Sequence, residues 1–265
     1  MSSFLYLYGF VPAAVPLPAE GLAGVADGVV QLVPLDGFAA AVSPVPAADF
    51  APEELEERTR DLKWVGAHGI AHEAVVAWFV DHAHIVPVPV FTLFSSTSAL
   101  VADARARAEW IAESLRRFEG LREWDLKVAC AHDELAAHAG ELSPDVAELD
   151  RRIAAASPGT RFLLERKREE LVRSEVTRAA HAIADELLAL AGEFARRTRS
   201  LPLVRAEGPA AVVLNAAVLV PVEHEDELLQ RFAARAAELA PRGIAVLLSG
   251  PWAPYRFVAE EEALA

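Results

Sequence analysis

A stretch of about forty residues, from Thr160 to about Arg199, constrains the fold of this chain more than any other feature. It contains no proline and one interior glycine, Gly192. Its apolar residues recur at spacings of three and four, which places them on one face of a helix. These residues are Val172, Val176, Ala179, Ile183, Leu187, Leu190 and Phe194. Because so long a helix exceeds the span of about 30 Å of a small domain, we expect it to join two lobes or to offer a face to a partner.

The residues that flank this stretch predict where the helix begins and ends. Ser157 and Pro158 stand in the order typical of an N-cap followed by proline in the first turn. Basic residues gather near Arg199, where they suit the negative end of the helix dipole. The sequence therefore predicts a helix over about 158–199. We interpret its charged first part, Arg161 to Arg173, as a solvated face.

Composition and charge restrict the class of protein. The chain has 265 residues and a formal net charge of -14, which argues against nucleic acid and against an anionic membrane surface as partners. The single cysteine, Cys130, leaves no internal disulfide and no zinc site of several cysteines, and it fits a reducing compartment. No uninterrupted apolar run is long enough to span a bilayer, and the N-terminus has no basic region typical of a signal peptide. We expect an acidic, soluble, cytoplasmic protein.

The first 120 residues show the pattern of a mixed α and β domain. Phe4 to Gly9 is a short aromatic run that predicts a strand. Val29–Leu35 and Phe38–Val42 predict two more strands, joined by a hairpin turn at Asp36-Gly37. An acidic helix start follows at Pro52, and the helix is expected to continue to about residue 81 with a break near Gly66 or Gly69.

The pattern continues with a proline-containing strand and a second amphipathic helix. Ile85–Phe94 contains Pro87 and Pro89, so this strand is expected at a sheet edge or in broken form. The serine-rich cluster after it offers N-caps for a helix over about 101–118, which ends at Gly120. We place the boundary between two domains there, 1–120 and 121–265.

The second half alternates strands and helices. Glu123–Val128 predicts a half-buried strand, and a short helix follows over about 133–139. After the long helix, Ala211–Val220 reads as a strand buried on both faces, followed by a helix over 224–240 and a strand at Ile244–Leu248. These two strands lie either parallel, or antiparallel around another strand in a ferredoxin-like arrangement. The predicted class is α+β.

The sequence contains few signs of catalysis. His68 and His72 are four residues apart on a predicted helix and could share one metal ion, but position 76 is valine rather than part of a zinc-protease motif. Histidines without a ligand role are the favoured interpretation. No nucleophile elbow surrounds Ser249, and no phosphate-binding glycine loop is present. We predict no catalytic residue, no metal and no cofactor.

The closing segment, Gly250 to Phe257, is the most unusual part of the chain. Two prolines stiffen its backbone, and Trp252, Tyr255 and Phe257 supply large rigid side chains. Tryptophan and tyrosine are enriched in binding hot spots, so we interpret these rings as a protein-binding surface. The other interpretation is that they cover the end of a sheet, and the two are compatible.

Five segments together resemble the gas vesicle protein GvpL/GvpF family. They occur in the family's order and at its spacing: Phe4–Gly9, His68 with Val86–Phe94, Glu123–Val128, Ser157–Leu163 and Gly250–Phe257. The chain departs from the usual pattern in two places. Val90-Phe91-Thr92 lacks the usual glycine before threonine, and Ala253 stands where a proline is common. These departures affect local loop shape.

The resemblance implies an accessory protein of gas vesicle formation. It implies an N-terminal α+β domain and a C-terminal ferredoxin-like domain carrying the long helix, with no catalytic activity and no cofactor. It also implies that the protein binds the shell protein GvpA, prevents its aggregation and helps to nucleate the shell, with other gas vesicle accessory proteins as further partners. We expect it in the cytoplasm, associated with gas vesicles.

Three hypotheses follow, in decreasing order of preference. The first is a binding and assembly protein that uses two surfaces, the closing rings and the long helix; its candidate contact residues are Trp252, Tyr255, Phe257, Leu187, Leu190 and Phe194. The second is an enzyme of unknown chemistry centred on His68 and His72. The third is a passive oligomerising component of the vesicle shell.

Overall fold

The first strand, β1 (Ser3–Pro12), lies inside a five-stranded sheet of order β2-β3-β1-β4, and β5 also pairs with β1. The computed structural model describes residues 3–203 and 210–262 of the chain. β3 (Phe38–Pro46) pairs with β1 antiparallel along nearly its whole length, from Ser3↔Pro46 to Pro12↔Phe38. The predicted opening strand is confirmed.

The predicted hairpin is also confirmed. β2 (Gln31–Pro34) pairs antiparallel with β3, and the turn lies at Asp36-Gly37. Gly37 has φ 85°, a left-handed conformation that glycine adopts without strain. The backbone N–H of Leu35 donates to the carbonyl of Phe38 at 2.9 Å and closes the turn.

Three helices follow β3: α1 (Ala47–Phe50), α2 (Pro52–Arg58) and α3 (Leu62–His82). The expected break near Gly66 or Gly69 is wrong, because both glycines lie inside α3 and the break falls at residues 59–61. Asp61 explains why the break lies at residues 59–61. Its side chain accepts hydrogen bonds from the backbone N–H groups of Lys63 and Trp64 and so caps the new helix. The later part of α3 packs Val75, Val76 and Phe79 into the same core as the rings of β1.

The proline-containing strand is broken, as expected. It consists of two short pieces, β4 (Val86–Pro87) and β5 (Leu93–Phe94), which both pair with β1. Gly9 permits the first contact, because a Cβ atom there would lie 2.5 Å from the carbonyl oxygen of Val86. Two helices, α4 (Thr97–Ala106) and α5 (Ala108–Arg117), follow where one was expected, and they are separated at Arg107.

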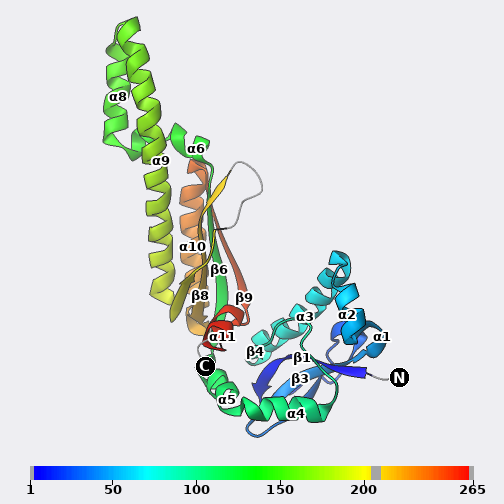
Figure 1. Cartoon of the computed structure of the whole chain (residues 1–265). Helices are drawn as coiled ribbons and strands as arrows, with labels where there is room; N and C mark the ends of the chain where they lie inside the picture. The colour runs from blue at the N-terminus through cyan, green and yellow to red at the C-terminus, as the bar shows by residue number, and fades with distance from the viewer. Residues whose placement is uncertain (1–2, 204–209, 263–265) are drawn as a thin grey trace. The chain divides into compact units, whose positions relative to one another are not determined.

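A four-stranded sheet of order β7-β8-β6-β9 organises the second half of the chain (Figure 1). Its strands are β6 (Leu121–Cys130), β7 (Arg197–Ser200), β8 (Ala211–Pro221) and β9 (Ile244–Trp252). Along the chain the main elements follow the sequence β6, α9, β7, β8, α10, β9. This is the βαββαβ order of a ferredoxin-like fold, with β8 and β9 on either side of β6. The predicted α+β class and ferredoxin-like domain are confirmed.

Alternate residues of the inner strands pack against two helices, α9 (Pro158–Phe194) and α10 (Glu225–Leu239). From β6 these are Trp124, Leu126, Val128 and Cys130, and from β8 they are Leu214, Ala216, Val218 and Val220. The period of two places each set on one face of the sheet. Cys130 is a buried core residue, and burial raises the pKa of its thiol.

The long helix is confirmed, but its predicted end is wrong. The helix stops at Phe194, and Arg197–Ser200 form β7, which pairs antiparallel with β8. The backbone N–H of Arg196 already donates to the carbonyl of Leu219 at 2.8 Å. Hydrogen bonding to a strand far along the sequence therefore decides the conformation of the basic residues, rather than the helix dipole.

Short helices occupy the region between β6 and α9. They are α6 (His132–Ala137), α7 (Ala139–Leu142) and α8 (Pro144–Ala155). α8 packs beside the first part of α9, and the two form a helical hairpin that extends beyond the end of the sheet (Figure 1). The first buried residue of α9 is Val172, so its charged first part lies outside the core.

The chain divides into two units, and both ends of the chain belong to the same one. The first unit contains Met1–Glu123 and Pro251–Ala265, and the second contains Trp124–Gly250. The division into domains 1–120 and 121–265 differs from these units, because residues after Pro251 pack with the N-terminal residues. Tyr255 and Ala253 belong to the core of the first unit.

Candidate functional site

The closing segment changes conformation in its middle. β9 continues through Trp252, Ala253 and Pro254 are buried, and helix α11 (Tyr255–Glu262) begins at Tyr255. Pro251 lies within the strand, whereas Pro254 lies between the strand and the helix, so the segment is not extended over its whole length. This arrangement directs Tyr255 and Phe257 into the first unit, where Phe257 is completely buried.

A chain of hydrogen bonds fixes Tyr255 to β1 and α3. His72 is 1% exposed, and its Nδ1 lies 3.1 Å from the hydroxyl of Tyr6 while its Nε2 lies 3.0 Å from the hydroxyl of Tyr255. The hydroxyl of Tyr255 donates a hydrogen bond to Oε2 of Glu73 at 3.2 Å. The hydroxyl of Tyr6 accepts a hydrogen bond from the backbone N–H of Phe91 at 3.0 Å.

One protonation state of His72 satisfies all of these bonds. Because Tyr255 donates to Glu73, it accepts from the Nε2–H of His72, and the free Nδ1 then accepts from Tyr6. A protonated His72 would need Tyr6 to accept rather than donate. Burial lowers the pKa of His72 to about 4, which keeps the ring neutral at pH 7. Burial also raises the pKa values of Tyr6, Tyr255 and Glu73.

A second polar contact holds the next residue of α11. The backbone N–H of Arg256 donates to Oε2 of Glu123 at 3.0 Å, and the guanidinium of Arg256 forms an ion pair with the other carboxylate oxygen. The Glu123 side chain is 1% exposed, whereas that of Arg256 is 37% exposed. The start of α11 is therefore attached to the first unit by two adjacent side chains.

The predicted binding residues fall into buried and accessible groups. In the closing segment Trp252 is 37% exposed, Tyr255 is half-buried, and Phe257 is buried. In α9, Leu187 and Phe194 lie in the core of the second unit, whereas Leu190 is partly buried. The structure does not bring these two sets together in one unit. Their role in binding stays a prediction, and Trp252 and Leu190 are the members of each set that combine an apolar side chain with access to solvent.

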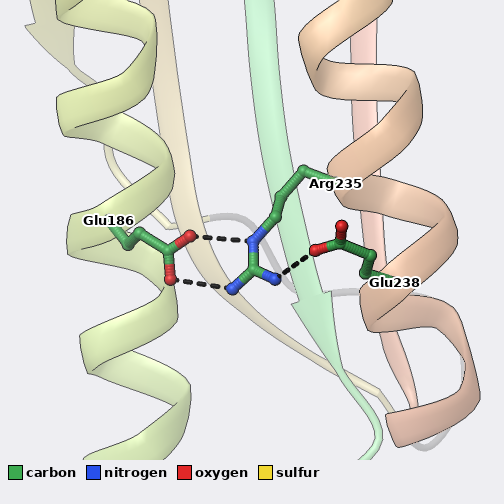
Figure 2. A network of polar contacts seen from close by, with 3 residues as sticks. All are labelled: Glu186, Arg235 and Glu238. Carbon is green, nitrogen blue, oxygen red and sulfur yellow. Dashed lines mark hydrogen bonds and ion pairs between the residues drawn. The ribbon is translucent and has the colours of Figure 1, made fainter.

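Leu190 lines a groove of about 390 Å³ between α9 and α10. The other lining residues are Glu186, Ala189, Glu193, Arg231, Ala234, Arg235 and Glu238. Arg235 donates to both carboxylate oxygens of Glu186, at 2.8 and 2.9 Å, and to Glu238 at 2.7 Å (Figure 2). The lining of the groove therefore combines apolar residues with charged residues that are bonded to one another. It could accept an apolar side chain or a short helical face from another protein.

The two histidines of the enzyme hypothesis have separate surroundings. His68 contacts the carbonyl of Trp64 through Nδ1 at 2.7 Å, and its ring lies against the indole of Trp64 with centroids 4.0 Å apart. Both ring nitrogens of His72 form hydrogen bonds, Nδ1 with the hydroxyl of Tyr6 and Nε2 with the hydroxyl of Tyr255. Across residues 3–203 and 210–262, no cluster of three or more histidine, cysteine, aspartate or glutamate side chains could hold a metal ion.

Comparison with known proteins identifies the family. Residues 4–259 match the sequence profile of the family described as "Gas vesicle synthesis protein GvpL/GvpF". The chain belongs to the GvpL/GvpF family. It is 28% identical over 258 residues to "Gas vesicle protein L" of Streptomyces sp. (strain CB03234), with 92% of this chain and 89% of that protein covered. It is 24% identical to "Gas vesicle protein L2" of Halobacterium salinarum (strain ATCC 700922 / JCM 11081 / NRC-1), with 97% and 92% covered.

Two crystal structures share the fold of this GvpL/GvpF-family chain. GvpF from Microcystis aeruginosa matches with a TM-score of 0.67 and 18% identity, covering 97% of this chain and 99% of that one. GvpF from Anabaena sp. PCC7120 matches with a TM-score of 0.68 and 20% identity, covering 97% and 98%. The two-lobed α+β architecture is thus shared over nearly the whole chain. Within the described residues, no helix has the length and apolarity needed to cross a membrane.

Sequence reasoning missed the polar contacts of α11 with the rest of the first unit. The sequence places Glu123 in a half-buried strand and Arg256 in the closing segment but predicts no partner for either, although Glu123 is buried. A usable signal was present: Glu123 begins an alternating strand, and a carboxylate next to Trp124 in such a strand is a candidate for burial with a partner. The partner itself lies 133 residues away and gives no local signal.

Proposed function

We propose that this chain is an assembly factor of gas vesicles that binds the shell protein GvpA before the shell forms. The proposal rests mainly on the family match over residues 4–259. In this proposal the protein keeps GvpA from aggregating, helps to nucleate the shell, and acts in the cytoplasm in association with gas vesicles. Its partners are GvpA and other gas vesicle accessory proteins, and it catalyses no reaction.

Charge and surface chemistry support this role. A shell subunit with an exposed apolar face aggregates unless another protein covers that face before assembly. A chain with a net charge of -14 keeps such a complex in solution through electrostatic repulsion between complexes. It also needs accessible apolar side chains for the contact, and the two predicted surfaces supply Trp252 and Leu190.

The groove on the second unit suits the recognition of a helix. Ala189, Leu190 and Ala234 are its apolar lining residues, while Arg235 is held by Glu186 and Glu238. An amphipathic helix binds such a groove through apolar residues at helical spacing. The closing segment would provide a second, aromatic contact through Trp252.

Co-expression with GvpA tests the proposal. We expect the soluble fraction of GvpA to rise several-fold in the presence of the wild-type chain. Trp252→Ala and Leu190→Ser should each reduce this gain, and the combination should remove most of it. Leu247→Ser is the matched control, because Leu247 is also an exposed apolar residue and lies outside both surfaces.

Two results would count against the proposal. One is a soluble yield of GvpA that does not change with the wild-type chain. The other is a GvpA complex that persists undiminished in the Trp252→Ala, Leu190→Ser double variant, which would exclude these two surfaces as the contact.

A further inference from the structure

Exposed apolar side chains gather in two places outside the surfaces discussed above. In the described part of the chain, the four large hydrophobic residues with the greatest exposure are Leu62 (83%), Ile70 (74%), Phe162 (67%) and Leu163 (67%). The first two lie on α3 in the first unit, and the other two lie on α9 in the second unit. A single exposed leucine is ordinary, but two such residues two turns apart on one helix, as in α3, or next to each other, as in α9, indicate contact surfaces.

The first surface, here called the acidic stripe, consists of Leu62, Gly66 and Ile70 with the acidic residues of α2. Residues four apart lie on one face of a helix, so Leu62, Gly66 and Ile70 form a continuous line. Apart from its two chain neighbours and the backbone of its own helix, nothing lies within 4 Å of the place where a Cβ of Gly66 would be, which leaves the line open. Residues 49–63 contain six acidic and three basic residues, a formal charge of -3.

The second surface, here called the basic tip, is formed by residues 148–168 at the end of the α8–α9 hairpin (Figure 1). This segment contains six basic and three acidic residues, a formal charge of +3 in a chain of net charge -14. Glu148 pairs with Arg151 and Asp150 pairs with Arg168. Four further basic residues of this segment are exposed, Arg152, Arg161, Arg166 and Lys167, and so is one acidic residue, Glu165.

We propose that the basic tip of one copy of this chain binds the acidic stripe of a second copy. The two surfaces are complementary in both respects: each has two exposed apolar side chains, and the segments named above have formal charges of opposite sign. At physiological salt, charges separated by more than about 8 Å are largely screened, so the local charges govern the contact more than the net charge of each copy. The contact does not depend on binding to GvpA and can be tested on the purified chain alone.

The geometry of such a contact determines the kind of assembly. Because the two surfaces differ, a pair of copies keeps one unused stripe, on the copy that contributes its tip, and one unused tip, on the other copy. A head-to-tail contact of this kind forms either closed rings or open chains. Assembly should therefore continue beyond a dimer as the protein concentration rises, unless two copies close on each other.

Sedimentation velocity of the full chain in 0.15 M salt provides the first test. Between about 1 and 200 µM, we expect the average sedimentation coefficient of the wild type to rise with concentration. Phe162→Ser combined with Leu163→Ser should weaken the association at least tenfold. These side chains are exposed, so the variant should retain the wild-type circular dichroism spectrum. Leu247→Ser, on the exposed face of β9, should stay within about twofold of the wild type.

A charge exchange provides the sharper test. One variant reverses the tip with Arg161→Glu, Arg166→Glu and Lys167→Glu, and the other reverses the stripe with Glu53→Lys, Glu54→Lys and Glu57→Lys. Each variant alone should associate at least tenfold more weakly than the wild type. An equimolar mixture should regain association, because the normal tip of one variant meets the normal stripe of the other and the reversed pair is also complementary.

Five outcomes would overturn the proposal. They are a wild type that stays monomeric over the whole range, self-association that both variants leave unchanged, and a mixture that does not associate. The fourth is binding of the wild type to vesicles of 25% phosphatidylserine that Phe162→Ser with Leu163→Ser removes, at concentrations where the chain is monomeric. That result would assign the tip to an anionic lipid surface. Cross-links between tip and stripe that form within one chain, independently of concentration, would likewise contradict a contact between copies.

Discussion

Each unit contains an arginine bonded to carboxylates, and the two sites differ in burial. In the first unit, Arg256 bonds Glu123, whose side chain is 1% exposed. In the second, Arg235 bonds Glu186 and Glu238, whose side chains are 51% and 65% exposed. A buried carboxylate that loses its partner cannot regain water, whereas an exposed one is solvated at once. We infer that the first site fixes α11 in place, while the second contributes little to stability and leaves its groove available to a partner.

The contrast extends to the other polar groups of the first unit. His72, Tyr6 and Tyr255 form a connected set of hydrogen bonds inside the protein, where each unsatisfied group would cost free energy. The ion pairs of the groove lie at the surface between two helices. The four predictions below test this contrast.

Replacing Arg256 should have the largest effect. Arg256→Met leaves the buried carboxylate of Glu123 without its guanidinium, and we expect the free energy of unfolding to fall by about 3 kcal/mol at pH 7. Urea denaturation followed by circular dichroism measures the change. Arg235→Met is the matched control at the exposed site and should cost less than about 1 kcal/mol. Equal losses at the two sites would contradict the contrast.

Acidification should destabilise the first unit through His72. Its pKa is about 4 in the folded chain and about 6.5 in the unfolded chain, so below pH 6.5 the unfolded state binds a proton that the folded state does not. This contribution is complete above pH 6.5 and is lost as the pH falls toward 4. Between pH 6.5 and pH 5 the loss should approach about 2 kcal/mol.

The variant His72→Gln isolates that contribution. Glutamine does not titrate, so the difference in unfolding free energy between wild type and variant should shrink as the pH falls from 6.5 to 5. The raised pKa of Glu73 acts in the opposite direction, because a carboxyl that binds its proton more readily when folded favours folding in acid. Glu73 is present in both proteins and largely cancels in the difference. A difference that is constant with pH would show that His72 does not titrate in this way.

Removing one hydroxyl should have a smaller effect. Tyr255→Phe retains the ring but leaves Nε2 of His72 and Oε2 of Glu73 without this partner, and we expect a loss of about 1.5 kcal/mol in unfolding free energy. The same substitution in a His72→Gln background should cost less, because the two side chains are coupled. Additive losses would place the hydroxyl outside the hydrogen-bonded set.

The sequence predicted most of the elements because their patterns are local. The alternation from Glu123 to Val128 lies within β6, and the helical spacing from Val172 to Phe194 lies within α9. The ferredoxin-like order follows from the succession of these elements. Local sequence patterns did not predict where the helices end. Arg197–Ser200 became a strand because β8 offered backbone hydrogen bonds from residues about twenty positions away.

The candidate site was predictable in residue type but not in orientation. Trp252, Tyr255 and Phe257 stand in one short segment, and only their partners decide which of them are buried. Tyr255 meets His72, which is 183 residues away, and Phe257 lies in the interior. Leu187 and Leu190 show the same limit, because they are three residues apart on α9 and only Leu187 is fully buried. The sequence pattern identifies an apolar face but not how far the sheet covers it.

The smallest effect is expected at the exposed arginine itself. Arg235→Gln removes the positive charge that pairs with the carboxylates of Glu186 and Glu238. Water can then solvate both carboxylates, so the free energy of unfolding should fall by about 0.5 kcal/mol. In 0.5 M NaCl the wild type and variant should become indistinguishable, because salt screens exposed charges. Thermal denaturation at two salt concentrations measures both effects, with Arg256→Met as the comparison that should keep most of its loss in high salt. A loss at Arg235 that persists in 0.5 M NaCl would mean that this ion pair holds α9 and α10 together, and the groove would then be a rigid structural contact rather than an accessible surface.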